Sequence, residues 1–471
     1  MSDLHAGIAA LTAAFPAGIV ITDPDITLTY SRDMAMMAPS ETPLAVVRAR
    51  NTDDVSTVLK IASAHGIAVH PRGAGSGLAG SSNATKDSIV LSLASMNKIL
   101  EINKADRYAR VQPGVVNLDF RKAIAPHSLF YPPDPSSYDW CTLGGNLSTN
   151  AGGLCCVKYG VTTDFVMGLE VVLADGQILR TGRRTVKGVA GYDLARVFVG
   201  AEGTLGVITE ATLMLRPMPS APCTLVAIFS SVLDAGEAVE QIIDAGLVPS
   251  LLEIMDRTTI RAVDDLHHLQ LDRDASAILL AQSDSGGTRA DEEMDALEAA
   301  CQAAGATELH RTNDLDEGEM LLFARRQGLP ALEAYKGASI VDDVAVPRSR
   351  MADFMVGVEK IAAQTQTTIG TIGHAGDGNM HPTICLDPSD AAEKQRAYEA
   401  FDLILELGLS LGGTITGEHG VGSIKQDFLA KEIGPIALGV HRAIKNALDP
   451  RGTLNPGKLF DNLPDIELGL Q

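Results

Sequence analysis

Apolar residues recur along this chain with two spacings, and the change from one to the other predicts helices and strands. Residues 3–15 have the pattern of a short amphipathic helix. Residues 52–54 cap a second helix, whose apolar positions share one face. These positions are Val55, Val58, Leu59 and Ala62. Short apolar runs predict strands at residues 43–48, 66–70, 88–93, 98–103 and 108–112.

A change in pattern after Pro217 indicates a second domain. Before it, an Asp-Gly turn at residues 175–176 joins strand candidates 166–173 and 177–181 into a hairpin. After it, strand and helix patterns alternate without glycine-rich loops, which is typical of a separate α+β domain. The strand candidates are residues 223–230, 249–254, 276–282 and 367–373. The helical runs are residues 233–245, 288–304 and 313–327.

A glycine-rich stretch, residues 71–82, directly follows the strand at residues 66–70. Its glycines let backbone N–H groups turn inward, and such a nest of amides binds anionic oxygens, above all a pyrophosphate. Residues 75–80 satisfy GxGxxG, but residues 81–87 have the composition of a turn. A Rossmann unit requires a helix there, so we reject that interpretation. A glycine-rich turn without a ligand remains the plain alternative.

Two more glycine-rich loops follow, at residues 142–153 and 200–209. Between the first two loops, residues 131–137 carry three prolines and cannot be helical. Three glycine-rich loops within residues 71–209 are hard to explain as turns alone. They suit a long, bent ligand wrapped by backbone amides, such as a dinucleotide.

Composition narrows the partners and the compartment. The 471 residues suffice for two or three domains, and the net charge of −21 argues against nucleic acid or an anionic membrane as main partner. Six cysteines without a CxxC motif exclude an evident iron–sulfur or zinc-ribbon framework and suit a reducing cytoplasm. No signal peptide is evident, and the apolar run at residues 217–233 is marginal as a membrane span. We therefore expect a soluble cytoplasmic protein.

Three histidines lie in glycine-flanked turns of the C-terminal half. His374 and His381 stand on either side of a turn containing Asp377-Gly378, so a hairpin-like bend could aim both imidazoles at one point. Glu418 and His419 add a carboxylate and a third imidazole in another glycine-rich bend. Two histidines and one glutamate can bind a divalent metal with open coordination positions. Ordinary hydrogen-bonded histidines are the alternative, and the residues alone favour neither.

The motifs together resemble a known family. PRGAGSGLAG (71–80), PPDPSS (132–137), LGGNLSTNAGG (143–153) and GAEGTLGVIT (200–209) occur in the order seen in FAD-binding domains of the vanillyl-alcohol oxidase/p-cresol methylhydroxylase fold. With the histidine motifs, the chain is similar to FAD-linked D-2-hydroxyacid dehydrogenases of the glycolate oxidase/D-lactate dehydrogenase group. The resemblance implies an α+β fold. Its expected parts are an N-terminal helical segment (1–42), a two-subdomain FAD-binding domain (43–217), an α+β substrate or cap domain with the metal site (218–410), and a C-terminal helical segment returning to the flavin (411–471).

The resemblance also implies cofactors and residue roles. Relatives with covalent flavin often have a histidine in the first loop, where this chain has only Gly, Ala and Ser, so we expect noncovalent FAD. His374, His381 and Glu418 correspond to ligands of a divalent metal (zinc, manganese or iron), His419 to the base, and Arg325 to an arginine that binds the substrate carboxylate. The expected FAD contacts are Pro71, Arg72, Gly73, Ala74, Gly75, Ser76, Gly77, Gly80, Ser81, Pro135, Ser137, Leu143, Gly144, Asn150, Ala151, Gly153, Tyr159, Glu202, Gly203, Gly206, Ile208 and Asn455.

The implied reaction is oxidation of a small D-2-hydroxy acid, D-lactate or glycolate, to the 2-oxo acid by hydride transfer to flavin N5. Haem, iron–sulfur and NAD motifs are absent from the sequence, so electrons must pass to a quinone, flavoprotein, cytochrome, iron–sulfur subunit or dioxygen. Open alternatives are a D-2-hydroxyglutarate dehydrogenase, a flavin subunit of a multi-subunit glycolate oxidase, a non-redox flavoenzyme such as an ether-lipid synthase, and an electron-transfer subunit without a substrate. A homodimer and peripheral membrane attachment through a redox partner also stay open.

Substrate size follows from two further positions of the resemblance. In relatives similar to 2-hydroxyglutarate dehydrogenases, a threonine and a lysine hold the distal carboxylate. Leu329 and Val341 occupy those positions here, and Asp342 beside them would repel a second carboxylate. We therefore expect a monocarboxylic substrate, unless Lys336 swings in and supplies the missing cation.

Overall fold

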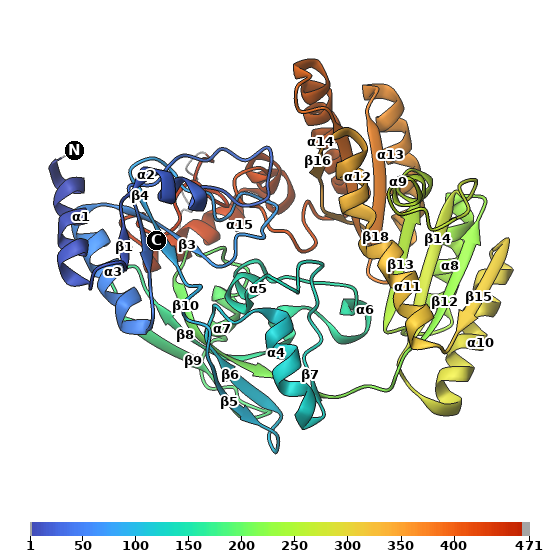
Figure 1. Cartoon of the computed structure of the whole chain (residues 1–471), viewed down its shortest axis with the longest axis horizontal. Helices are drawn as coiled ribbons and strands as arrows, with labels where there is room; N and C mark the ends of the chain where they lie inside the picture. Colours follow the sequence, from blue (N-terminus) through green and yellow to red (C-terminus); the bar gives the residue numbers. More distant parts are fainter. Residues whose placement is uncertain (1, 464–471) are drawn as a thin grey trace. The chain divides into compact units, whose positions relative to one another are not determined.

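The computed structural model describes residues 2–463, which form two compact units (Figure 1). The first unit holds the described residues up to Ala151, Val161–Met218 and those from Glu418 onward. The second unit holds Gly152–Gly160 and Pro219–Gly417. The change at Met218 lies beside the boundary expected from sequence. The second unit, however, continues past residue 410 to Gly417, and it takes in one short segment from the glycine-rich region.

A four-stranded sheet carries the first glycine-rich loop. Its order is β1 (Val20–Ile21), β2 (Ala45–Arg48), β4 (Ser88–Ser92) and β3 (Ala68–Arg72), with β2, β4 and β3 parallel. The β1 strand pairs antiparallel with β2, so residues 1–42 are not wholly helical as expected. They also contain α1 (Ser2–Ala14), α2 (Pro24–Thr27) and a 3₁₀ turn, η1 (Leu28–Tyr30).

The predicted helix between β2 and β3 is confirmed as α3 (Thr52–His65). Asn51 caps it by accepting a hydrogen bond from the Asp54 backbone N–H at 2.9 Å, and Gly66 ends it at φ +63°. The predicted apolar face is fully buried. It packs with residues of β2, β3 and β4 and with Val172 and Val207 of the neighbouring sheet, so the helix joins both sheets of this unit.

That neighbouring sheet has five antiparallel strands. They are β5 (Ile99–Asn103), β6 (Tyr108–Val111), β10 (Val207–Met214), β8 (Val166–Val172) and β9 (Ile178–Gly182). The predicted Asp-Gly hairpin between β8 and β9 is confirmed, with Gly176 at φ +82°. A two-stranded ribbon, β7 (Leu129–Phe130) with β11 (Arg216–Pro217), completes the strands of this unit.

The second glycine-rich stretch is not all loop. Its residues form a two-turn helix, α5 (Leu143–Thr149), because Thr142 caps it and Leu143 and Leu147 bury one face. Burial thus outweighs the low helix propensity of its two glycines. The other helices of this unit are α4 (Asn117–Ile124), α7 (Leu194–Phe198) and α15 (Gln426–Leu448), with η2 (Ala125–His127) and η3 (Thr162–Phe165). The α15 helix is kinked at Gly434-Pro435.

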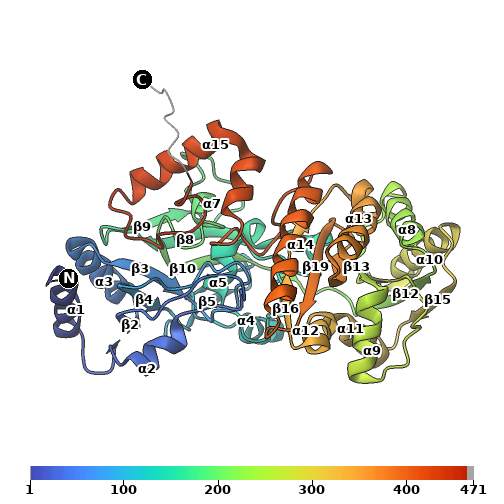
Figure 2. The same ribbon diagram turned by 90° about the horizontal axis from the view of Figure 1, so that it is seen from above.

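The second unit is a sheet with helices on both faces (Figures 1 and 2). Its strands, in spatial order, are β15 (Glu308–Thr312), β12 (Cys223–Phe229), β14 (Ala277–Ser283), β13 (Leu251–Asp256), β18 (Thr368–His374), β19 (Asn379–Leu386) and β16 (Ala338–Val341), with β17 (Val344–Ala345) also on β19. One face carries α9 (Arg257–His267), α11 (Leu315–Arg326) and α12 (Gly328–Lys336). The other carries α8 (Val232–Asp244), α10 (Gly287–Ala303), α13 (Met351–Thr365) and α14 (Ala391–Ser410). The predicted strands and helices are confirmed within two residues, whereas the helices α9, α12, α13 and α14 and the strands β15, β16, β17 and β19 were not predicted. The short elements are α6 (Cys156–Tyr159) and η4 (Arg348–Arg350).

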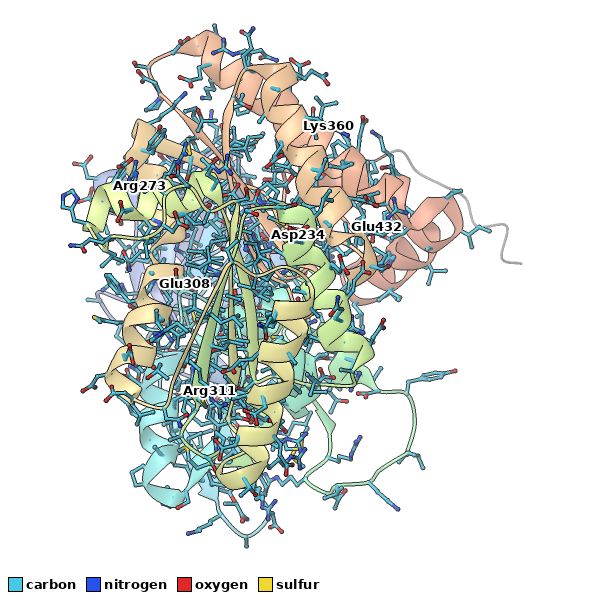
Figure 3. All side chains as sticks on the ribbon, turned by 90° about the vertical axis from the view of Figure 1, so that its right-hand side faces the viewer. Asp234, Arg273, Glu308, Arg311, Lys360 and Glu432 are labelled. Atoms are coloured by element: carbon cyan, nitrogen blue, oxygen red, sulfur yellow. The ribbon has the colours of Figure 1, made fainter. Side chains whose placement is uncertain are left out.

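Ion pairs cover the outer faces of this unit. Arg311 of β15 lies 2.8 and 2.7 Å from Asp291 and Asp295 of α10, and Arg273 lies 2.9 Å from Asp264. Figure 3 labels both arginines on this unit. Each such exposed pair contributes little to the free energy of unfolding. Among the described residues, every helix is too short or too polar to span a membrane.

Candidate active site

The first glycine-rich loop needs its glycines for conformation and for space. Gly75 and Gly80 adopt φ +82° and +76°, in the left-handed region. A Cβ on Gly75 would lie 2.1 Å from Nη2 of Arg72, and one on Gly80 would lie 2.4 Å from the Cβ of Ala38. The loop therefore folds closely under the Arg72 guanidinium. A cation therefore lies beside the loop that is predicted to bind an anionic group.

A buried network joins this loop to the third glycine-rich segment and to the C-terminal segment. The Glu202 carboxylate accepts hydrogen bonds from Ser81 Oγ at 2.5 Å and from the backbone N–H groups of Val421 and Gly422 at 2.8 and 2.9 Å. Asn455 Nδ2 donates to the carbonyls of Ser81 and Glu202. Burial raises the pKa of Glu202, and these bonds oppose the rise. Ser81, Glu202 and Asn455, chosen from distant motifs, are thus brought together.

The second and third segments also meet. The backbone N–H groups of Gly200 and Glu202 donate to carbonyls at the end of α5, where Asn150 turns left-handed at φ 53°. Gly206 provides space, since a Cβ there would lie 2.4 Å from Val171. The remaining predicted contacts of this unit lie in the first loop, in the turn before α5, in α5 and at the start of β10; they are Pro71, Gly73, Ala74, Ser76, Gly77, Pro135, Ser137, Leu143, Gly144, Ala151, Gly203 and Ile208.

Two predicted cofactor contacts, Gly153 and Tyr159, belong to the second unit instead. There, the Tyr159 hydroxyl and the Lys158 ammonium both donate to the Asp284 carboxylate. Tyr159 is therefore held by an aspartate more than a hundred residues away in sequence. Its role as an FAD contact stays a prediction.

Sequence reasoning missed several buried charged or titratable groups of the first unit, and three of them lie near the first glycine-rich loop. They are Asp33, His70 and Lys458. Burial lowers the pKa of Lys458, which interacts with the Asp33 and Glu202 carboxylates. Lys458 lies three residues after Asn455, so its place beside that motif was the available signal. With Arg72 it puts a second cation near the glycine-rich loop of a chain whose net charge is −21.

His70 locks the C-terminal segment onto the base of the loop. Its Nδ1 lies 2.6 Å from Asn455 Oδ1, and its Nε2 accepts from the Thr85 backbone N–H at 3.3 Å. Because an amide oxygen can only accept, Nδ1 carries the hydrogen and the ring is neutral. Burial above all, with the charge of Lys458, lowers the pKa of His70 to about 4, although the bond to Asn455 opposes the shift.

We predict an acid-sensitive step in stability from His70. Its folded pKa lies below the ordinary value of 6.5, so the unfolded state takes up a proton first as the pH falls. The neutral His70 ring makes its full contribution to the free energy of unfolding above pH 6.5. This contribution, about 3 kcal/mol, is lost as the pH falls to 4. Urea unfolding followed by flavin fluorescence should show a shallower pH slope in His70→Gln than in the wild type. The exposed His127→Gln is the control; equal slopes for all three proteins would contradict the assignment.

The second unit buries a cluster of catalytic residue types around the β18–β19 hairpin. This hairpin is confirmed, with His374 opposite Asn379 and His381 opposite Ile372. The register places both imidazoles on one face, their ring centroids 5.2 Å apart and nearly perpendicular. Their ligand nitrogens lie within 4.8 Å of one another. The predicted convergence of His374 and His381 is therefore observed.

Two charged side chains on the same face support this pair. The Glu253 carboxylate lies 2.7 Å from His374 Nδ1 through Oε1 and 2.5 Å from Arg325 Nη2 through Oε2. Arg325 and Glu253 are 3% and 1% exposed, so the ion pair is fully buried. Sequence reasoning named Arg325 but missed Glu253, which lies among the apolar residues of β13.

The Asp343 carboxylate binds the backbone just before Glu418 and His419, the last predicted site residues. Its Oδ2 accepts from Thr416 Oγ1 at 2.7 Å and from the Gly417 backbone N–H at 2.9 Å, and its Oδ1 lies 3.7 Å from His381 Nδ1. A Cβ on Gly417 would lie 2.3 Å from Asn379 Oδ1, so only glycine fits. Gly417 ends the second unit, and Glu418 and His419 are the next two residues of the chain.

Comparison with known proteins identifies the family. Residues 43–182 match the model of an FAD binding domain, and residues 218–459 match that of the C-terminal domain of FAD linked oxidases. The chain belongs to the FAD-linked oxidases. Ser81 of the Glu202 network lies in the first matched region, and Glu202 lies between the two regions. The His374–His381 hairpin lies in the second matched region.

Relatives of this FAD-linked oxidase include the glycolate oxidase subunit GlcD of Bacillus subtilis, 43% identical over 92% of this chain and 92% of that protein. A D-lactate dehydrogenase of Anaerostipes hadrus is 32% identical over 93% of this chain and 94% of that protein. Among solved structures, p-cresol methylhydroxylase superposes with a TM-score of 0.82 at 19% identity, over 99% of this chain and 98% of that one. The expected α+β fold of that type is thus confirmed, and the chain is an FAD-linked oxidoreductase of the glycolate oxidase/D-lactate dehydrogenase type.

The donor atoms around the β18–β19 hairpin are chemically suited to a divalent metal. His374 Nδ1 lies 2.7 Å from Glu253 Oε1, so its Nε2 would be the ligand atom. His381 supplies a second imidazole, and the buried Asn379 Oδ1 has no hydrogen-bond donor among the described residues. Imidazoles with a carboxylate are suitable ligands for zinc, manganese or iron.

Proposed function

We propose that this FAD-linked oxidase dehydrogenates a small D-2-hydroxy acid with the help of a divalent metal. The observation that carries the proposal is the buried His374–His381 pair, next to the Asp343-anchored Gly417 that precedes Glu418 and His419. The names of the relatives, a glycolate oxidase subunit and a D-lactate dehydrogenase, support the substrate class.

In this proposal His374, His381 and Glu418 hold the metal, and His419 is the base. When bound, FAD would supply a hydride acceptor and the metal would supply a Lewis acid for the substrate hydroxyl. His419 accepts the hydroxyl proton, a task that suits an imidazole near neutral pH. Gly417, directly before Glu418 in the chain, donates its backbone N–H to Asp343.

Arg325 is proposed to bind the substrate carboxylate. Its Nη2 faces Glu253, but its buried Nε has no hydrogen-bond acceptor among the described residues. A buried guanidinium donor without an acceptor is costly, and a carboxylate can satisfy Nε and a neighbouring nitrogen together. The expected role of Arg325 is thus compatible with its ion pair.

We predict a preference for monocarboxylic substrates. Leu329 packs against an apolar cluster with Ile372, and Lys336 is occupied by Glu393 at 2.5 Å, so neither supplies a charge for a distal carboxylate. Leaving that carboxylate unpaired should cost several kcal/mol, so kcat/KM for D-lactate should exceed that for D-2-hydroxyglutarate by about a hundredfold or more. Dye-acceptor assays across D- and L-hydroxy acids test this. A preference for the diacid would show that the pocket has been misread.

We predict that the FAD is held without a covalent bond, since the first loop has no histidine. Acid precipitation should leave the yellow chromophore in the supernatant. Flavin that stays with the pellet after repeated washing would contradict this. Electrons then pass to an acceptor outside the chain, and the word subunit in the name of the GlcD relatives favours a protein acceptor within a complex.

The rival is a flavin subunit that transfers electrons and has no substrate of its own. That rival does not require Glu418 or His419. A wild type that oxidises no hydroxy acid, together with a Glu418→Ala/His419→Ala protein that passes electrons from an external donor at the wild-type rate, would favour it. The proposal expects the same protein to retain FAD and to be inactive.

A further inference from the structure

One carboxylate contacts both halves of the proposed substrate site. Glu253 approaches the histidine proposed as a metal ligand through Oε1 and the arginine proposed to bind substrate through Oε2. A carboxylate can only accept, so His374 Nδ1 carries the hydrogen, and Nε2 is the atom through which the proposed metal would be bound. The same carboxylate balances the charge of a guanidinium that is 3% exposed.

The sheet fixes this arrangement. Glu253 of β13 stands directly opposite His374 of β18 in antiparallel register. Two residues further along the same strands, Met255 pairs with Ile372, and both are buried together with Ile260 of α9. Neighbouring strands therefore hold the carboxylate, and Arg325 reaches it from the last turn of α11. A position set by paired strands is more rigid than one set by a loop.

We propose that Glu253 is a positioning residue that couples the metal ligand His374 to the substrate-binding Arg325. The inference rests on the proposed function. Glu253 keeps one tautomer and ring orientation of His374, and it holds the guanidinium so that Nε stays available. Removing its charge leaves the buried Arg325 without a counter-charge. The same change weakens the contact that orients His374. Both effects come from one side chain, so they should appear together.

The test compares Glu253→Gln, Arg325→Gln and the wild type. The affinity for Zn²⁺ added alone is measured by competition with a chromophoric chelator, and kcat and KM for D-lactate are measured separately. Glu253→Gln should bind Zn²⁺ about tenfold to a hundredfold more weakly and also raise KM. Arg325→Gln should raise KM but leave the Zn²⁺ affinity within about threefold. Glu293→Gln is the matched control. Glu293 lies on α10, which packs on the same sheet, and its carboxylate accepts hydrogen bonds from Ser283 and Ser285.

Each outcome decides something. A folded Glu253→Gln protein with wild-type Zn²⁺ affinity overturns the coupling and leaves the proposed function standing. A wild type that binds no divalent metal overturns both. If Glu253→Gln does not accumulate as a folded flavoprotein, Glu253→Asp replaces it, since it keeps the charge but is one methylene too short to reach both partners. Unchanged Zn²⁺ affinity and KM in Glu253→Asp would then contradict the inference.

Discussion

Replacing His381 with alanine should remove the bound metal and lower kcat/KM by about a thousandfold or more. A Lewis acid contributes several kcal/mol to stabilisation of developing charge, and each 1.4 kcal/mol is about tenfold in rate. His381 lies in β19 and packs against His374, and its Nδ1 is 3.7 Å from the Asp343 carboxylate, which is too far for a strong hydrogen bond. In the proposal this imidazole is a ligand of the metal, so its loss should lower the metal content of a protein that still folds and binds FAD.

Elemental analysis of protein purified without chelator measures this directly. The wild type should hold close to one equivalent of zinc, manganese or iron, and His381→Ala should hold little. His310→Ala is the control, since His310 is exposed on β15 and pairs with Glu317. Full activity of metal-free wild type after exhaustive chelation would rule out metal assistance.

Replacing His419 with alanine should lower kcat by about a hundredfold to ten-thousandfold, the usual contribution of a positioned general base. FAD and metal content should stay unchanged, because the proposal assigns this side chain to proton transfer alone. His419→Gln keeps a polar side chain of similar reach but cannot take up the proton, so it should be equally slow. The measurement is kcat with saturating D-lactate as a function of pH.

The pH profile separates this role from a structural one. In the wild type, kcat should rise with pH as the base loses its proton. In both variants that rise should be absent, and the residual rate should grow only with hydroxide. Variants that are slow but keep the wild-type pH profile would show that another group accepts the proton.

Local sequence patterns predicted the elements but not their distant partners. The spacing of Val55, Val58, Leu59 and Ala62 gave the buried face of α3, and the Asp-Gly turn gave the β8–β9 hairpin, because both depend on neighbouring residues. The bend between His374 and His381 was predictable for the same reason. The helix α5 was not, since burial of two leucines outweighed its glycines.

The partners of the site residues could not be read locally. Glu253 lies 121 positions before His374, and His70 lies 385 positions before Asn455. Glu253 and His70 each lie in a short, mainly apolar strand, where a polar residue has no periodic signature. Only the three-dimensional register shows that these polar groups face one another. The resemblance identified Arg325, and the structure added the carboxylate that holds it.

The most direct test of the account is anaerobic reduction of the enzyme-bound flavin by a single substrate. Metal-replete protein mixed with D-lactate or glycolate in a stopped-flow instrument should lose its flavin absorbance in one rapid phase. Metal-free protein and His419→Ala should bleach slowly, and L-lactate should not bleach the flavin at all. Rapid bleaching by a D-hydroxy acid with the metal removed and His419 replaced would contradict the proposed mechanism, whatever acceptor the enzyme uses.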